Sequence, residues 1–256
     1  MEKEQIEKTK QKFDSILHTN GYKKIHSDEK HLRNLLNLFK LKPNCSYLDL
    51  GTGNGYLAFA LAEKNKNILV EGLDIVENSI IKNKQITKEK GLKNIKFKTY
   101  DGINFPYPDG FFSGGISRYA LHHFPNVNHS IKEINRVLEQ DGFFILSDAK
   151  TYDIDSNGFI DEFQKFLEDG HNHFYYENEL IELFNNQGFI KEKIFYSYIR
   201  YPRKHNKRYQ DIINNESKEV INKYKMEVVD DNIFMTVQIM NILFRKIVLT
   251  ESNLEM

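Results

Sequence analysis

The sequence predicts an α/β fold in which helices cover both faces of a mostly parallel sheet. Short apolar runs typical of buried strands alternate along the chain with amphipathic helical segments. The first such run, at residues 45–50, leads into three alternating glycines, and the apolar helical stretch 56–63 follows directly. Strand, glycine turn and helix form the first unit of nucleotide-binding α/β domains, because glycine lets the backbone approach a ligand closely.

The length and composition are typical of one large globular domain, or of one domain with an appended lobe. The chain has 256 residues, and Lys+Arg and Asp+Glu each total 36, so the net charge is zero. We therefore expect no nucleic-acid partner, since non-specific nucleic-acid binders carry surplus positive charge. The single cysteine, Cys45, permits no internal disulfide, and no apolar run reaches the roughly 18 residues of a membrane span. With a charged N-terminus that lacks a signal-peptide pattern, these features predict a cytoplasmic protein.

Helices are expected before the first strand. A thin apolar stripe runs through residues 1–20, Gly21 interrupts it, and Asp28 stands at the start of a second helix. We expect residues 1–40 to form a helical cap on a domain that spans 41–256. Two roles stay open for this cap: it covers an edge of the sheet, or it is a lid over a substrate pocket.

An acidic residue ends the second predicted strand, at residues 68–74. Asp74 lies 19 positions beyond Gly55, close to the interval of about 20 residues after which an acid meets a ribose in nucleotide-binding units. A carboxylate can accept hydrogen bonds from both vicinal ribose hydroxyls, so ribose binding is favoured over a solvated loop acid. Ile75 is then placed to lie against the flat face of an adenine.

The alternation of strands and helices continues to residue 150. A strand at 95–100 ends in Asp101-Gly102, and a short strand ends at Ser117. The next segments are the loop Leu121-His122-His123-Phe124, the helix Glu133-Ile134-Asn135-Arg136-Val137-Leu138, and a strand at 143–148.

This order of signals, with Asp49-Leu50-Gly51-Thr52-Gly53-Asn54-Gly55 before it, resembles the UbiE-like, or type 11, branch of the class I S-adenosylmethionine-dependent methyltransferases. The resemblance covers residues 45–150. An NAD-linked oxidoreductase would need a third glycine at position 56, where Tyr56 stands.

The resemblance implies a Rossmann-like class I methyltransferase fold with a seven-stranded, mostly parallel sheet. Its antiparallel last strand would be the apolar stretch 233–244, inserted between its neighbours and paired with 190–199. A cofactor half would span 41–150, and substrate-side elements would span 151–230. Two departures from the family pattern, Ser113 and the pair Gly114-Gly115, bear on local packing.

The resemblance also implies S-adenosylmethionine as the cofactor. The glycine turn would line its methionine and ribose end through Asp49, Gly51, Thr52, Gly53 and Gly55. Asp74 would hold the ribose hydroxyls. Four further residues are expected around the adenine and the sulfonium: Asp101 at the adenine amino group, Gly102 and Ile103 beside the ring, and Ser117 under the sulfonium.

Methyl transfer is a direct displacement, so the protein mainly aligns the reacting atoms and excludes water. A general base is needed only if the acceptor must lose a proton. The sequence does not choose among the candidates, which are Tyr119, His122, His123 and His171. No cysteine cluster or His-x-x-x-His spacing suggests a metal.

We expect the methyl acceptor to be a small apolar or aromatic molecule, and the protein to be a monomer or homodimer. Its pocket would be formed by the N-terminal helices, the loop 119–124 and the segment 171–176. The basic run 200–209 is interpreted as a solvated loop that enters a helix and contributes less. Two alternatives stay open, an RNA methyltransferase and a non-catalytic S-adenosylmethionine-binding module; the presence of both Asp74 and Asp101 favours an enzyme.

Overall fold

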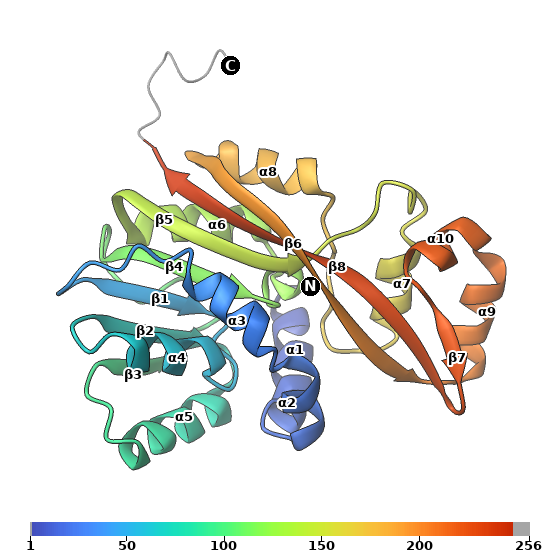
Figure 1. Cartoon of the computed structure of the whole chain (residues 1–256), viewed down its shortest axis with the longest axis horizontal. Coiled ribbons are helices and arrows are strands. Elements are labelled where there is room, and N and C mark those ends of the chain that lie inside the picture. Colours follow the sequence, from blue (N-terminus) through green and yellow to red (C-terminus); the bar gives the residue numbers. More distant parts are fainter. Residues whose placement is uncertain (1, 248–256) are drawn as a thin grey trace.

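The computed structural model describes residues 2–247. Its main sheet has the strand order β3-β2-β1-β4-β5-β8-β6, and a short β7 pairs with β8 at one end (Figure 1). The first five strands pair in parallel, whereas β8 lies antiparallel between β5 and β6. The predicted seven-stranded sheet with an inserted antiparallel last strand is confirmed.

The strands are β1 Ser46–Leu50, β2 Leu69–Asp74, β3 Ile95–Thr99, β4 Phe112–Arg118, β5 Leu138–Ala149, β6 Phe189–Lys204, β7 Glu227–Val229 and β8 Asn232–Lys246. The helices are α1 Glu2–Ile16, α2 Asn20–His26, α3 Glu29–Leu36, α4 Tyr56–Lys64, α5 Glu77–Glu89, α6 Val127–Val137, α7 Phe159–Lys165, α8 Glu177–Asn185, α9 Lys207–Asn215 and α10 Lys218–Lys223, with a 3-10 turn, η1, at Leu121–His123. Among residues 2–247, none of these helices is both long and apolar enough to cross a membrane.

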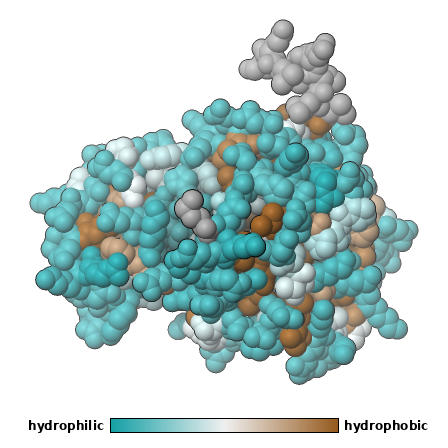
Figure 2. Space-filling view, turned by 180° about the vertical axis from the view of Figure 1, so that it is seen from behind, coloured by the Kyte–Doolittle hydropathy of each residue, from teal (hydrophilic) through white to brown (hydrophobic). Residues whose placement is uncertain are grey.

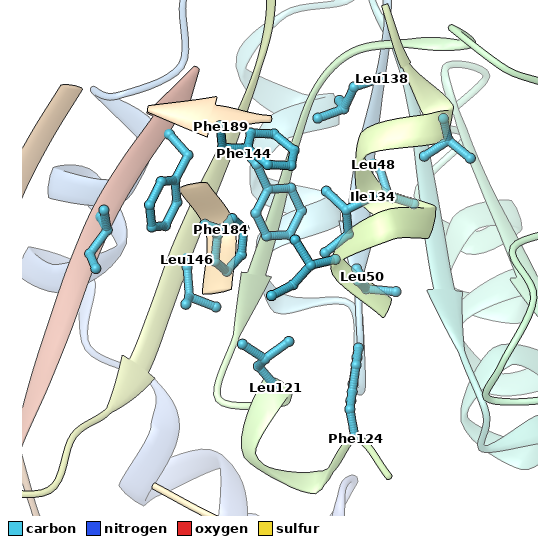
Figure 3. Close-up of a cluster of buried hydrophobic side chains, with 14 of the residues drawn as sticks. Leu48, Leu50, Leu121, Phe124, Ile134, Leu138, Phe144, Leu146, Phe184 and Phe189 are labelled. Carbon is cyan, nitrogen blue, oxygen red and sulfur yellow. The ribbon is translucent and has the colours of Figure 1, made fainter. Parts of the chain in front are cut away.

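Each face of the sheet packs against its own set of helices. Leu48 and Leu50 of β1 belong to a core shared with α6 and α8, which Figure 3 shows in close-up. Tyr47 belongs to a second core, shared with α3, α4 and α5. This alternation follows from the strand geometry, in which successive side chains point to opposite faces.

A third core lies at the end of the sheet where β6 and β8 extend beyond the other strands. The strands β6 and β8 are 16 and 15 residues long and extend beyond the other strands to a lobe of α7, α9, α10 and β7 (Figure 1). Their extension buries Ile233 and Met235 of β8 against aromatic residues of the lobe. Seen from behind, the surface is mainly hydrophilic and the lobe projects to the left (Figure 2).

This extension corrects three predictions about the second half of the chain. The paired strands are longer than 190–199 and 233–244, because the register continues to Lys204 opposite Asn232. The run 200–209 is therefore not a loop: residues 200–204 belong to β6. The helical stretch expected at 211–225 is two helices, since Ser217 caps a new helix by accepting from the Val220 amide.

The N-terminal segment also differs from the prediction at one point. Gly21 does not interrupt the helices but lies inside α2. Thr19 accepts a hydrogen bond from the Tyr22 amide at the start of this helix, and the Tyr22 ring stacks on His26 with centroids 4.0 Å apart. These contacts offset the low helix propensity of glycine.

The two glycines of β4 have a packing explanation. Gly114 and Gly115 pair in register with Phe143 and Phe144 of β5. A β-carbon on Gly114 would collide with the Phe143 ring, and one on Gly115 would lie 3.1 Å from Phe144. The family pattern has aliphatic side chains at these two positions of β4. In this chain the Phe143 and Phe144 rings of β5 fill that space.

Gly114→Val should destabilise the protein by about 1–3 kcal/mol, because extra atoms would be forced into a filled core. Gly21→Ala is the matched control: a β-carbon there meets nothing within 4 Å. The control should be neutral or stabilising by up to about 1 kcal/mol, through helix propensity. Denaturant unfolding measures both, and an unchanged midpoint for Gly114→Val would contradict this packing account.

Candidate functional site

The glycine turn between β1 and α4 is tight because two chain segments meet there. Gly51 has a left-handed backbone with φ of 70°, and a β-carbon on it would lie 2.5 Å from the β-carbon of Ala120. Asp49 stabilises the turn, because its Oδ2 accepts hydrogen bonds from Thr52 Oγ1 (2.7 Å) and from the Ala58 amide (3.1 Å). Burial raises the pKa of Asp49 to about 6. Only glycine fits at position 51.

Asp74 links this turn to the end of β2. Its Oδ2 accepts from the Gly53 amide at 2.7 Å, and its Oδ1 accepts from the Val76 amide at 2.9 Å. The residue is buried, which raises its pKa. A carboxylate has about four acceptor positions, so two amide contacts leave capacity for further donors.

Three cavities meet beside the carboxyl ends of the parallel strands. The Asp74 cavity, of about 80 Å³, is lined by Gly51, Gly53, Asp74, Ile75 and Gly102 among others. The α4 cavity, of about 40 Å³, lies where α4 begins and includes Asp49, Thr52, Asn54 and Arg118 in its lining. The histidine cavity, of about 310 Å³, includes His122, His123, His171 and Phe174. Tyr22 and Tyr119 line all three.

Four residues predicted to bind the cofactor line none of these cavities: Gly55, Asp101, Ile103 and Ser117. Asp101 closes its own turn, with Oδ1 accepting from the amides of Ile103 (2.8 Å) and Asn104 (2.7 Å). Partial burial by itself raises the pKa of Asp101, but these hydrogen bonds outweigh that effect, so the pKa is lowered. Ser117 is fully buried, and its hydroxyl has no partner among residues 2–247. The adenine contact of Asp101 stays a prediction.

Sequence reasoning missed Arg118, the last residue of β4. Its side chain lines both the Asp74 cavity and the α4 cavity. Nη2 donates to the His26 carbonyl at 2.7 Å, and the guanidinium lies over the Tyr119 ring, 4.1 Å from its centroid. Within the described part of the chain it forms no ion pair. A basic residue at the carboxyl end of a parallel strand was the available signal.

His122 is held by a carboxylate that the prediction also left out. Its Nδ1 lies 2.6 Å from Asp148 Oδ1, and Asp148 Oδ2 accepts from the His122 amide at 3.2 Å. Burial alone lowers the pKa of His122, but Asp148 outweighs burial and raises it above the ordinary 6.5. With Nδ1 engaged, Nε2 is the nitrogen available to the cavity.

Of the other three catalytic candidates, His123 lines the same cavity but is buried, and its Nδ1 has no hydrogen-bond partner among residues 2–247. His171 and Tyr119 have structural partners. His171 Nε2 lies 2.8 Å from Asp161 Oδ1, and burial lowers the pKa of His171. The Tyr119 hydroxyl lies 3.3 Å from His31 Nδ1, and Tyr119 has a positive φ of 56°. The structure thus brings Tyr119, His122 and His171 to one cavity, and His122 alone combines a paired Nδ1 with an available Nε2.

Strand residues that were not predicted complete the histidine cavity. Ile199, Tyr201 and Arg203 of β6 and Val237 and Ile239 of β8 line it together with residues of α1 and α2. The expectation that the run 200–209 contributes less is therefore wrong for Tyr201 and Arg203. The error follows from the predicted strand length, since a strand that ends at 199 cannot place these side chains at the cavity.

The first helix closes the site. Gln5 Nε2 of α1 donates to the carbonyls of His123 (3.3 Å) and Gly170 (3.1 Å), which joins two loops of the histidine cavity. Ile6 of α1 packs on Gly102, while Leu17, just after the helix, packs on Gly53. The N-terminal cap thus covers the cavities.

Comparison with known proteins identifies the family. A profile described as "Methyltransferase domain" matches residues 41–217. The chain belongs to this methyltransferase domain family. The uncharacterized methyltransferase YcgJ of Bacillus subtilis is 30% identical over 125 residues, which cover 49% of each chain. The ubiquinone/menaquinone biosynthesis C-methyltransferase UbiE of Rickettsia akari is 32% identical over 130 residues, 49% of this chain and 50% of the relative.

These matches span about half the length of either relative. The crystal structure of Bacillus subtilis YcgJ superposes with a TM-score of 0.74 at 21% identity, and the match covers 86% of this chain and 99% of that chain. At this identity the likeness is one of fold.

The family implies S-adenosylmethionine as the cofactor, and the residues that line the cavities of this chain fit it. The Asp74 cavity offers a buried carboxylate with spare acceptor capacity beside a glycine that admits close approach. The α4 cavity joins it through Gly51, Gly53 and Arg118, and it offers a cation beside the start of a helix.

Asp74→Ala should lower the affinity for S-adenosylhomocysteine at least tenfold, because charge-assisted hydrogen bonds are worth about 1.5–3 kcal/mol each. Calorimetry measures the effect. The exposed acid Asp211 provides the matched control, and Asp211→Ala should bind normally. Thermal unfolding of Asp74→Ala and Asp74→Asn separates loss of binding from loss of fold. An unchanged affinity in folded Asp74→Ala would remove Asp74 from the site.

Proposed function

We propose that this protein is an S-adenosylmethionine-dependent methyltransferase that methylates a small apolar or aromatic molecule. The observation that carries the proposal is the meeting of three cavities at Tyr22 and Tyr119. One cavity suits an adenosine, one suits an amino-acid tail, and the largest is left for an acceptor. The family supports the reaction class.

The cofactor would be held along the carboxyl ends of β1, β2 and β4. Asp74 would accept from the ribose hydroxyls, with Ile75 against the adenine. Arg118 would donate to the methionine carboxylate in the α4 cavity, where the positive end of the α4 dipole also favours an anion. Tyr119, at the junction, would lie beside the sulfonium.

When bound, S-adenosylmethionine supplies a methyl group that the acceptor's electron pair captures, while the electrons of the broken carbon–sulfur bond remain on sulfur. The side chains of the histidine cavity position the acceptor and exclude water through apolar walls such as Phe174, Val237 and Ile239. Where the acceptor atom carries a proton, Nε2 of His122 takes it. Asp148 is the positioning residue, because its hydrogen bond orients the ring and stabilises the imidazolium that forms.

Arg118→Gln should weaken S-adenosylhomocysteine binding by about tenfold or more, the loss expected for a charge-assisted pair. The same variant should bind 5′-methylthioadenosine normally, because that ligand lacks the amino-acid tail. Calorimetry with both ligands decides the matter, and Arg118→Lys should keep part of the affinity. Equal losses for the two ligands would show that Arg118 acts on the adenosine side or on the fold.

Incubation with methyl-labelled S-adenosylmethionine and a fractionated small-molecule extract should transfer label to an extractable product. With the acceptor so isolated, kcat should rise with pH through a pKa above 6.5, since His122 must be deprotonated to accept a proton and Asp148 favours its charged form. Asp148→Asn should lower kcat and move this rise to lower pH, without changing S-adenosylhomocysteine affinity. No labelled product, with intact cofactor binding, would favour the non-catalytic module.

A further inference from the structure

The histidine cavity holds an arginine that the proposed reaction does not use. Arg203 lies near the end of β6, opposite Ile233 of β8 in the sheet register. It lines the histidine cavity but neither of the cofactor cavities. It is therefore placed to contact an acceptor and not the cofactor.

The guanidinium of Arg203 is fixed by neutral groups alone. Nη2 donates to Gln164 Oε1 at 2.9 Å, Nη1 donates to the Pro202 carbonyl at 3.1 Å, and the group lies over the Tyr201 ring, 4.2 Å from its centroid. Gln164 is in turn oriented by a hydrogen bond to the Tyr201 hydroxyl. Because Gln164 and Tyr201 are both buried, the guanidinium plane is preset.

This cation has no anionic partner among residues 2–247. Its Nε is buried without a hydrogen bond, and no described carboxylate oxygen lies within 4.0 Å of its nitrogens. The acid of the cavity, Asp169, accepts instead from the His171 amide at 3.0 Å. Lys12 of α1 adds a second cation to the same lining. A half-buried, unpaired charge is costly, and that cost falls when an anion binds.

Much of the remaining lining is apolar and lies further along β6 and β8 or on α2. Ile25, Ile199, Val237 and Ile239 line the same cavity. An apolar surface with one preset guanidinium suits a ligand with an apolar body and one carboxylate, because the planar fork of arginine matches carboxylate geometry.

We propose that the methyl acceptor carries a carboxylate, which pairs with Arg203 while its apolar body lies against Ile199, Val237 and Ile239. The inference rests on the proposed function, because it assigns the histidine cavity to the acceptor. It narrows the acceptor class from small apolar or aromatic molecules to those that carry a carboxylate.

The test compares 2-naphthoate with 2-naphthamide, two probes of equal shape that differ in charge, by calorimetry in the presence of S-adenosylhomocysteine. The unaltered protein should bind the naphthoate at least tenfold more tightly. Arg203→Gln should remove this preference while naphthamide affinity changes less than twofold, and Arg203→Lys should keep part of it. Arg208→Gln is the matched control, since Arg208 is exposed, covers the Phe166 ring and lies outside the cavity lining.

Equal affinities of the two probes for the unaltered protein would overturn the proposal, as would the absence of saturable naphthoate binding. A preference that persists in Arg203→Gln would also overturn it. The affinity for S-adenosylhomocysteine, measured in the same samples, separates the two proposals. If the unaltered protein does not bind S-adenosylhomocysteine, the proposed function is contradicted. If it binds S-adenosylhomocysteine but does not prefer naphthoate over naphthamide, only the proposal of an acceptor carboxylate is contradicted.

Discussion

The buried carboxylate of Asp74 is the contact on which the cofactor side of the molecule depends. It joins the glycine turn after β1 to the end of β2, through the amides of Gly53 and Val76. A buried carboxylate without partners would be expensive, and these two donors offset that cost. The same hydrogen bonds hold the carboxylate at the wall of a cavity, so one residue both shapes the turn and offers acceptors to a ligand.

A second constraint is the close approach of α1 to the loops of the histidine cavity. Gly170 has a left-handed backbone with φ of 77°, and a β-carbon there would collide with Thr9 of α1. Gln5 then reaches the carbonyls of both Gly170 and His123. The first helix of the N-terminal segment is therefore packed against the cavity loops, and its role as a lid over a substrate pocket stays a prediction.

The long pair β6 and β8 explains how one sheet serves two purposes. Where the pair lies beside β5, it completes the main sheet. Beyond β5, it lines the histidine cavity and packs against the helices α7, α9 and α10 of the lobe. Phe163 of α7 and Tyr209 of α9 pack together there with ring centroids 4.4 Å apart. The lobe thus supports the strand segment that presents Tyr201 and Arg203.

The sequence by itself determined the class of fold, the glycine turn, the acid after the second strand and the family, because these depend on local spacing. Tertiary structure alone decided how far β6 and β8 extend, since strand length follows from pairing with residues that lie between 28 (Lys204 with Asn232) and 57 (Phe189 with Lys246) positions away. It also decided that Asp148 pairs with His122 and that Asp101 folds back on its own turn. The roles of Arg118 and Arg203 follow only from the tertiary structure, in which each guanidinium lines a cavity and forms no ion pair with a carboxylate of the described residues.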